Sequence, residues 1–261
     1  MQTMDIARAA AVLWHAWQAG ECLEALPVGC RPAARAEGYA IQAQMARLSE
    51  QTVCGWKIAA TSTAGQGHIG VDGPLAGRLL QQRVYGSGAQ LSLHANRMRV
   101  AEAEFAFRLG RSLPPRAQPY TVDEVREAVD RAYPAIEVPD SRYRDFASVG
   151  APQLIADNAC ADWFVLGEAV KVPWRTRDLV QHRVTMQCNG RLAREGLGAN
   201  VLGDPWLALA WLANELATYD AGLLAGQVVT TGTCIVPLAV LPGDRLVADF
   251  GDFGRVEAVL T

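Results

Sequence analysis

The chain lacks the cysteine spacing of a thiolate metal site. Its six cysteines are widely scattered and include no C-x-x-C pair. This scatter argues against zinc held by thiolates. We expect free, buried thiols, as in proteins of a reducing compartment.

A basic excess and a long apolar run are also missing. The 24 lysines and arginines are outnumbered by 27 acidic residues, so nothing indicates binding to nucleic acid. No apolar run approaches the roughly 20 residues that span a bilayer, and Met1–Asp5 has no basic residue such as begins a signal peptide. We therefore expect a soluble, cytoplasmic protein without a membrane or nucleic-acid partner. Half of the 261 residues are hydrophobic, which suffices for a large core.

The stretch Val100–Leu109 predicts a strand with an apolar face and an acidic face. Side chains alternate along a strand, so Glu102 and Glu104 share the face opposite the alanines and phenylalanines. Their Cα atoms would lie about 6–7 Å apart, and a divalent cation would relieve the repulsion between the carboxylates. The alternative is an edge strand with solvated glutamates.

A second apolar strand, Ala135–Val138, carries a third glutamate. Glu137 lies on the face opposite Ile136 and Val138. The alternative for Glu137, too, is a solvated surface position. Three glutamates on two apolar strands nevertheless supply the hard oxygen ligands that Mg²⁺ or Mn²⁺ prefers.

One lysine lies in an apolar strand, Val53–Ser62. Apolar neighbours on both sides of Lys57 indicate burial, which would lower its pKa toward a value useful for proton transfer. The alternative is an edge-strand lysine that prevents aggregation.

The other segments outline an α+β protein. Apolar residues at helical spacing predict two N-terminal helices, over 6–17 and 39–48, that form a small cap. Seven of the 24 glycines lie in 65–88, which predicts turns and either a loop that lets the backbone approach a ligand or an ordinary connector. The further predictions are a helix from the capping box at 121–124 to Pro134, a strand ending near 167, a hairpin around Asn189-Gly190, a helix from Asp204-Pro205, and strands over 228–235, 246–250 and 256–260.

The motifs together resemble a known family. Their order is Gly55-Trp56-Lys57-Ile58, Gly70-Val71-Asp72, Glu102-Ala103-Glu104, Ala135-Ile136-Glu137-Val138, Ala156-Asp157-Asn158-Ala159, Val201-Leu202-Gly203-Asp204-Pro205 and Pro242-Gly243-Asp244. This order resembles the 2-keto-4-pentenoate hydratases and 4-oxalocrotonate decarboxylases of the fumarylacetoacetate hydrolase superfamily. The resemblance implies an α+β fold, a mixed β-roll with packed helices. We expect a helical N-terminal cap over 1–52 and a catalytic mixed-β domain over 53–261.

The resemblance also implies roles for the residues already singled out. It implies that Glu102, Glu104 and Glu137 bind one Mg²⁺ or Mn²⁺ and that Lys57 is the active-site lysine. Thr233 takes the place of a small hydroxyl residue near the substrate.

Three further positions are expected at the substrate. Asp157 belongs to an Asp-Asn pair that would line a pocket or form a turn. Cys160 occurs where relatives often have serine. Leu75 stands where the hydratases have an aspartate that assists proton or water handling, so we expect Asp72 to take over that catalytic task or the chemistry to differ.

The function implied is that of a metal-dependent lyase in the catabolism of aromatic compounds, a hydratase that adds water to a 2-hydroxy-2,4-dienoate. Leu75 keeps a decarboxylase open as an alternative, and a non-catalytic oxoacid-binding protein is a third. The partners expected are a small-molecule 2-oxoacid or dienoate and further copies of the chain in a homo-oligomer. Three arginines, Arg78, Arg142 and Arg144, are candidates for a second substrate carboxylate, although solvated surface positions are more typical.

Overall fold

The computed structural model describes residues 1–261 as six α-helices and thirteen strands. The helices are α1 (Thr3–Ala19), α2 (Arg35–Leu48), α3 (Thr63–His68), α4 (Val122–Ala128), α5 (Ala151–Ala156) and α6 (Pro205–Thr218). The strands are β1 (Val53–Ala59), β2 (Leu75–Leu80), β3 (Val84–Gly86), β4 (Ala89–Leu91), β5 (Val100–Leu109), β6 (Val129–Val138), β7 (Trp163–Leu166), β8 (Arg183–Cys188), β9 (Arg191–Leu197), β10 (Val228–Thr233), β11 (Leu238–Ala239), β12 (Arg245–Asp249) and β13 (Arg255–Leu260). No helix is long and apolar enough to cross a membrane.

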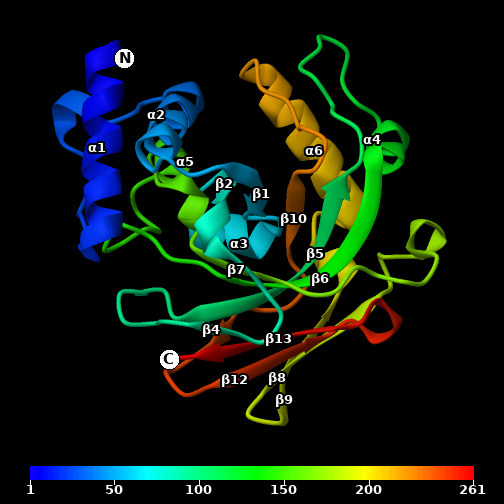
Figure 1. The fold of residues 1–261 in the computed structure, drawn as a ribbon. Coiled ribbons are helices and arrows are strands. Elements are labelled where there is room, and N and C mark those ends of the chain that lie inside the picture. Colours follow the sequence, from blue (N-terminus) through cyan, green and yellow to red (C-terminus); the bar gives the residue numbers. More distant parts are fainter.

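The strands form two mixed sheets. The larger has the order β2-β1-β10-β5-β6-β7-β3, with β11 added to β5, and the smaller has the order β4-β13-β12-β8-β9. Parallel pairs occur in both sheets among antiparallel neighbours: β1 with β10 and β3 with β7 in the larger sheet, and β13 with β4 in the smaller. In the view of Figure 1 the smaller sheet lies at the bottom, below the larger one, and α6 lies toward the top. The expected α+β fold with mixed sheets is confirmed.

The apolar face of β5 lies in the main core. Phe105 and Phe107 are fully buried, and Phe107 stacks on Trp206 of α6 with 4.3 Å between ring centroids. As predicted, α6 begins at Asp204, whose carboxylate accepts a hydrogen bond from the Trp206 backbone N–H at 2.9 Å, and has proline at its start. The core therefore fixes β5 with its two glutamates on the opposite face.

Helices α1 and α2 pack on each other at one edge of the molecule (Figure 1). They enclose a small apolar cluster of their own, which includes Leu13, Ile41 and Met45 and is completed by Tyr143 and Ala156 from farther along the chain. The two predicted N-terminal helices are confirmed. The division into a cap and a catalytic domain at residues 52 and 53 stays a prediction.

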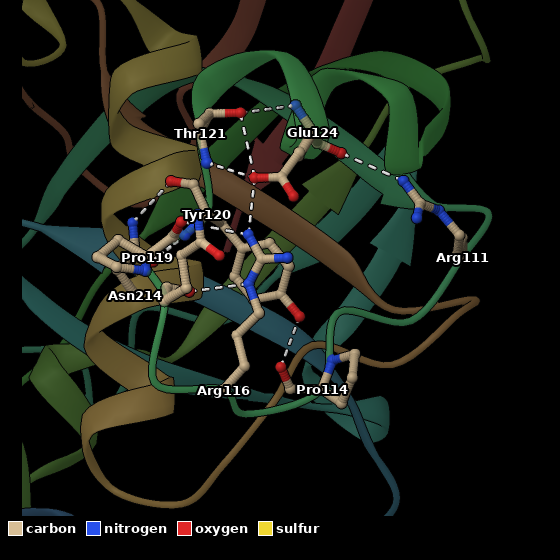
Figure 2. A network of polar contacts seen from close by, with 9 residues as sticks. Arg111, Pro114, Arg116, Pro119, Tyr120, Thr121, Glu124 and Asn214 are labelled. Carbon is tan, nitrogen blue, oxygen red and sulfur yellow. Dashed lines mark hydrogen bonds and ion pairs between the residues drawn. The ribbon is translucent and has the colours of Figure 1, made fainter.

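The helix predicted from the capping box to Pro134 is wrong at its end. Thr121 and Glu124 form the box (Figure 2), but α4 ends at Ala128 and β6 begins at Val129. Pro134 lies inside β6, and its carbonyl accepts a hydrogen bond from Gly167. Since the N–H and C=O of a strand residue point to the same side, the missing N–H of Pro134 faces the side of β7, which has ended at Leu166. On its other side Pro134 keeps its register position opposite Phe105 of β5.

The glycine-rich segment 65–88 is also more ordered than expected. It contains most of α3 and the strands β2 and β3, and β2 pairs with β1 along its whole length. At least one of these glycines belongs to an ordered element, since Gly77 in β2 allows the close approach of the Asn158 carbonyl. The hairpin around Asn189-Gly190 is confirmed as β8 and β9.

Candidate metal and active site

The three glutamates predicted from the sequence come together on one face of the larger sheet. Glu102 on β5 lies directly opposite Glu137 on β6, and Glu104 is two residues farther along β5. One carboxylate oxygen from each lies within 4.8 Å of the others. Glu104 and Glu137 are at most 1% exposed. The alternative of an edge strand with solvated glutamates is therefore wrong, because β5 lies between β10 and β6 in the sheet and two of the three carboxylates are buried.

This cluster fits a divalent cation. Glu104 Oε2 accepts a hydrogen bond from the Gly232 backbone N–H at 2.9 Å, but Glu104 Oε1 and Glu137 Oε2 are buried without a hydrogen-bond partner. Buried carboxylate oxygens are costly unless they are paired or bind a metal. Burial, and then the charge of Glu137, raises the pKa of Glu102 to about 7. Burial likewise raises the pKa of Glu104 and Glu137. Three oxygen ligands of this kind suit Mg²⁺, Mn²⁺ or Ca²⁺.

Lys57 reaches the same cluster from β1. Its side chain is 3% exposed, and Nζ lies 3.1 Å from Glu137 Oε1 and donates a hydrogen bond to the Ala159 carbonyl at 2.9 Å. The predicted burial is confirmed, but the predicted lowering of its pKa is wrong. Burial alone lowers the pKa of Lys57, yet the charges of Glu137, Glu102 and Glu104 outweigh it and raise that pKa above its ordinary value. The metal-free site therefore holds Lys57 as an ammonium.

Two threonines of β10 border the cluster. Thr233, which the sequence singled out, is paired with Glu104 in the sheet and donates its hydroxyl to the Ile235 carbonyl at 2.9 Å. Thr230 was missed, although it pairs with Lys57 on β1. Its hydroxyl is buried without a hydrogen-bond partner in the chain. The signal in the sequence was a pair of threonines in an apolar strand, which is too common to single out a site.

The structure separates Leu75 from Asp72. On β2, Gly77 lies opposite Lys57 in the sheet, so Leu75, two residues away, shares the Lys57 face and is buried there. The Asp72 side chain is 91% exposed, and its nearest cation is Arg35, at 3.7 Å. Asp72 is therefore not brought into the carboxylate cluster, and its catalytic role stays a prediction that this geometry does not favour.

Asp157 and Cys160 lie beside the site in supporting positions. The Asp157 carboxylate accepts hydrogen bonds from Ser141 Oγ at 2.7 Å and the Arg142 backbone N–H at 3.0 Å, and it is paired with the Arg142 guanidinium. These contacts occupy Asp157 and leave it little capacity for a substrate. Cys160 is buried, which raises the pKa of its thiol to about 12 and keeps it protonated.

Two of the three candidate arginines, Arg78 and Arg142, are not solvated surface residues. Arg142 is 2% exposed, since Asp157 neutralises it within the protein. Arg78 lies over the ring of Trp56 at 4.6 Å and donates to Gln42. Only Arg144 is exposed as expected, in an ion pair with Glu24.

The cysteines form no disulfide, and a surface cavity lies apart from the carboxylate cluster. All six cysteines are free, as expected; Cys30, Cys160 and Cys234 are buried and the other three are partly exposed. A surface cavity of about 390 Å³ lies between the end of α1 and residues 94–99, and none of the three glutamates lines it.

Comparison with known proteins agrees with the fold and with the cluster. A model of the fumarylacetoacetate (FAA) hydrolase C-terminal family matches residues 75–261. The chain belongs to this family. It is 35% identical over 260 residues to a 2-keto-4-pentenoate hydratase of Burkholderia vietnamiensis, covering 98% of both chains. It is also 31% identical over 226 residues to a 4-oxalocrotonate decarboxylase of Pseudomonas putida, covering 85% of this chain and 84% of the relative.

A solved structure of this family superposes over the whole chain. It is the 4-oxalocrotonate decarboxylase from Pseudomonas putida G7, complexed with magnesium and adipate. The TM-score is 0.91 at 26% sequence identity, with 100% of this chain and 99% of the other covered. The family resemblance and the fold that it implied are thus confirmed. The relatives named here are hydratases and decarboxylases, which are both lyases.

Proposed function

We propose that this member of the FAA hydrolase family is a metal-dependent hydratase. Its substrate would be a 2-hydroxy-2,4-dienoate of the 2-keto-4-pentenoate type, and its product a 4-hydroxy-2-oxoacid. The observation that carries the proposal is the buried cluster of Glu102, Glu104 and Glu137 with Lys57 against it. The 35% identity to a named hydratase over nearly the full length of both chains supports the reaction type.

The three glutamates would hold Mg²⁺ or Mn²⁺. When bound, such an ion supplies a Lewis acid that stabilises negative charge developing on a 2-oxoacid. Glu104 is held for this task by the Gly232 N–H. Glu102 and Glu137 face each other across β5 and β6, where like charges repel unless a cation lies between them.

Lys57 would carry the proton transfers. It lies within 3.1 Å of Glu137 and is closed off from solvent, so a proton on Nζ stays in the site until a substrate atom accepts it. An ammonium has three N–H donors, and Ala159 and Glu137 take two of them. The third is available to the substrate. The free hydroxyl of Thr230 offers another hydrogen bond to substrate or water.

The test follows 2-hydroxypenta-2,4-dienoate by ultraviolet absorbance with Mg²⁺, with Mn²⁺ and with a chelator. We expect metal-dependent loss of the dienoate, and loss of activity in E104Q, which keeps the Gly232 hydrogen bond but removes one charge from the ligand set. N214A, a change in α6 outside the cluster, is the control and should retain activity. Turnover that survives both chelation and E104Q would contradict the proposal.

A decarboxylase is the second candidate, because the apolar Leu75 shares the face of Lys57 while Asp72 points to solvent. The structural match to a decarboxylase complexed with magnesium and adipate supports this alternative. Release of CO₂ from 2-oxo-3-hexenedioate would favour it over the hydratase. Metal binding without turnover of either acid would favour an oxoacid-binding protein. The homo-oligomer stays a prediction, which light scattering tests.

A further inference from the structure

Three consecutive residues next to Lys57 have left-handed backbone. Asn158, Ala159 and Cys160 have φ angles of 56°, 49° and 60°, and none of them is glycine. For residues with a Cβ this conformation costs about 1–2 kcal/mol each, so it persists only where the surroundings enforce it. All three are buried.

The side chain of Asn158 ties this turn to β2. Its Oδ1 accepts a hydrogen bond from the Arg78 N–H at 2.7 Å, and its Nδ2 donates to the Arg78 carbonyl at 2.8 Å. One amide thus satisfies both backbone groups of a strand residue. The approach is possible because residue 77 is glycine: a Cβ at Gly77 would lie 2.3 Å from the Asn158 carbonyl oxygen.

The other end of the turn is tied to Arg142. Its buried guanidinium is paired with the Asp157 carboxylate and also donates to the carbonyls of Asp157 and Ala161, which flank the turn. Between these two attachments, the Ala159 carbonyl points at Lys57 and accepts its hydrogen bond.

We propose that Asn158 is a positioning residue for Lys57: by clamping Arg78 it enforces the left-handed turn and so places the Ala159 carbonyl that holds the ammonium. The Lys57 ammonium has two partners, the Glu137 carboxylate and the Ala159 carbonyl, and only the Ala159 carbonyl lies outside the carboxylate cluster. Asn158 therefore sets the orientation of Lys57 independently of the metal. The kinetic consequences rest on the proposed function, whereas the placement of Lys57 does not.

The test compares N158G with N214A. Glycine at 158 accepts a φ of 56° without strain, so N158G removes only the amide. Asn214 makes the same pair of bonds elsewhere: its Oδ1 accepts from the Tyr120 N–H at 2.7 Å and its Nδ2 donates to the Tyr120 carbonyl at 3.0 Å (Figure 2). Each variant loses a side-chain amide that bonds both backbone groups of a distant residue. Only the Asn158 amide belongs to the turn that contacts Lys57.

The first readout needs no substrate. The chain has only two lysines, Lys57 and the exposed Lys171, so the Mg²⁺-saturated protein can be acetylated with an N-hydroxysuccinimidyl ester and both lysines followed by mass spectrometry. Loss of one hydrogen bond to a charged group predicts a rise of about tenfold in the labelling of Lys57 relative to Lys171 in N158G. The ratio in N214A should match the wild type.

The second readout is kinetic. In N158G we expect kcat to fall about 100-fold with little change in KM and in Mg²⁺ affinity, because a misplaced proton donor slows chemistry more than binding. N214A should keep its kcat. A wild-type labelling ratio in N158G, or an equal change in both variants, would overturn the inference.

A second variant and the substrate-free readout allow the role of Asn158 and the proposed function to be tested separately. If N158G does not fold, N158D keeps the hydrogen bond from the Arg78 N–H but loses the one to the Arg78 carbonyl, and it should raise Lys57 labelling in the same direction; an unchanged ratio there also overturns the inference. If the wild type turns over no dienoate, the proposed function fails, while the labelling ratio still decides the role of Asn158.

Discussion

Removing the divalent cation should make the stability of this protein fall as pH rises. Without the ion, the pKa of Glu102 is about 7 in the folded protein against an ordinary value of 4.5, because of burial and the charge of Glu137. Between these two pH values the folded chain binds more protons than the unfolded chain. The contribution of Glu102 to the free energy of unfolding therefore decreases with rising pH across this window and levels off above about 7.

The size of the effect follows from the difference between the two pKa values. It corresponds to at most about 3 kcal/mol, and the partial exposure of Glu102 reduces what is realised. For a chain of this size, 3 kcal/mol is a fall in Tm of roughly 6–12 °C. A bound cation takes the place of the proton, so the metal-loaded protein should lose the contribution of Glu102 to this fall and keep only that of groups outside the site, such as Asp162. It should also bind Mg²⁺ more tightly as pH rises.

Scanning calorimetry between pH 4.5 and 7 with excess chelator or with excess Mg²⁺ measures this directly. E102Q is the control, since it should make the profile of the chelated protein less steep, while the raised pKa values of Glu104, Glu137 and Asp162 account for the slope that remains. The reasoning is refuted if Tm of the chelated wild type stays constant or rises over this range, or if Mg²⁺ leaves an equally steep fall.

Three further changes test the supporting structure. Burial raises the pKa of Asp162 to about 6 from 3.8, so wild type should lose up to about 3 kcal/mol relative to D162N as pH rises through that interval; parallel urea-denaturation profiles for the two would contradict this. G232A places a Cβ 2.1 Å from Thr61 Oγ1 at a φ of 102°, which should lower the free energy of unfolding by about 2–4 kcal/mol and weaken Mg²⁺ binding. Titration calorimetry would measure the Mg²⁺ affinity, and wild-type affinity and stability in G232A would contradict this prediction. W17A removes a half-buried ring on which the Arg142 guanidinium lies at 4.3 Å and should cost about 2 kcal/mol in urea denaturation, whereas a loss below about 0.5 kcal/mol would show that the stack is dispensable.

Local patterns in the sequence were sufficient for much of the fold. The alternation in Val100–Leu109 predicted both faces of β5, and Asp204-Pro205 and Asn189-Gly190 marked the start of α6 and the β8–β9 turn. These features depend on side-chain periodicity and on backbone preferences of single residues, which act over a few positions. The same local reasoning extended α4 too far, because Val129 suits a helical spacing and a strand equally well.

The sequence by itself determined the ingredients of the site: three glutamates at strand spacing and one lysine between apolar residues. Only the tertiary structure decided how they act on each other. The register of β5 with β6 places Glu102 opposite Glu137, and the pairing of β1 with β10 brings Lys57 to them.

Three outcomes depended on that assembly. Lys57 has a raised rather than a lowered pKa because carboxylates from other strands outweigh its burial. Arg142 is buried because Asp157 neutralises it. The left-handed turn at Asn158 exists because β2 holds it. Each is an interaction between charges or hydrogen-bonding groups far apart in the chain, and such energies depend on distances and burial that only folding sets.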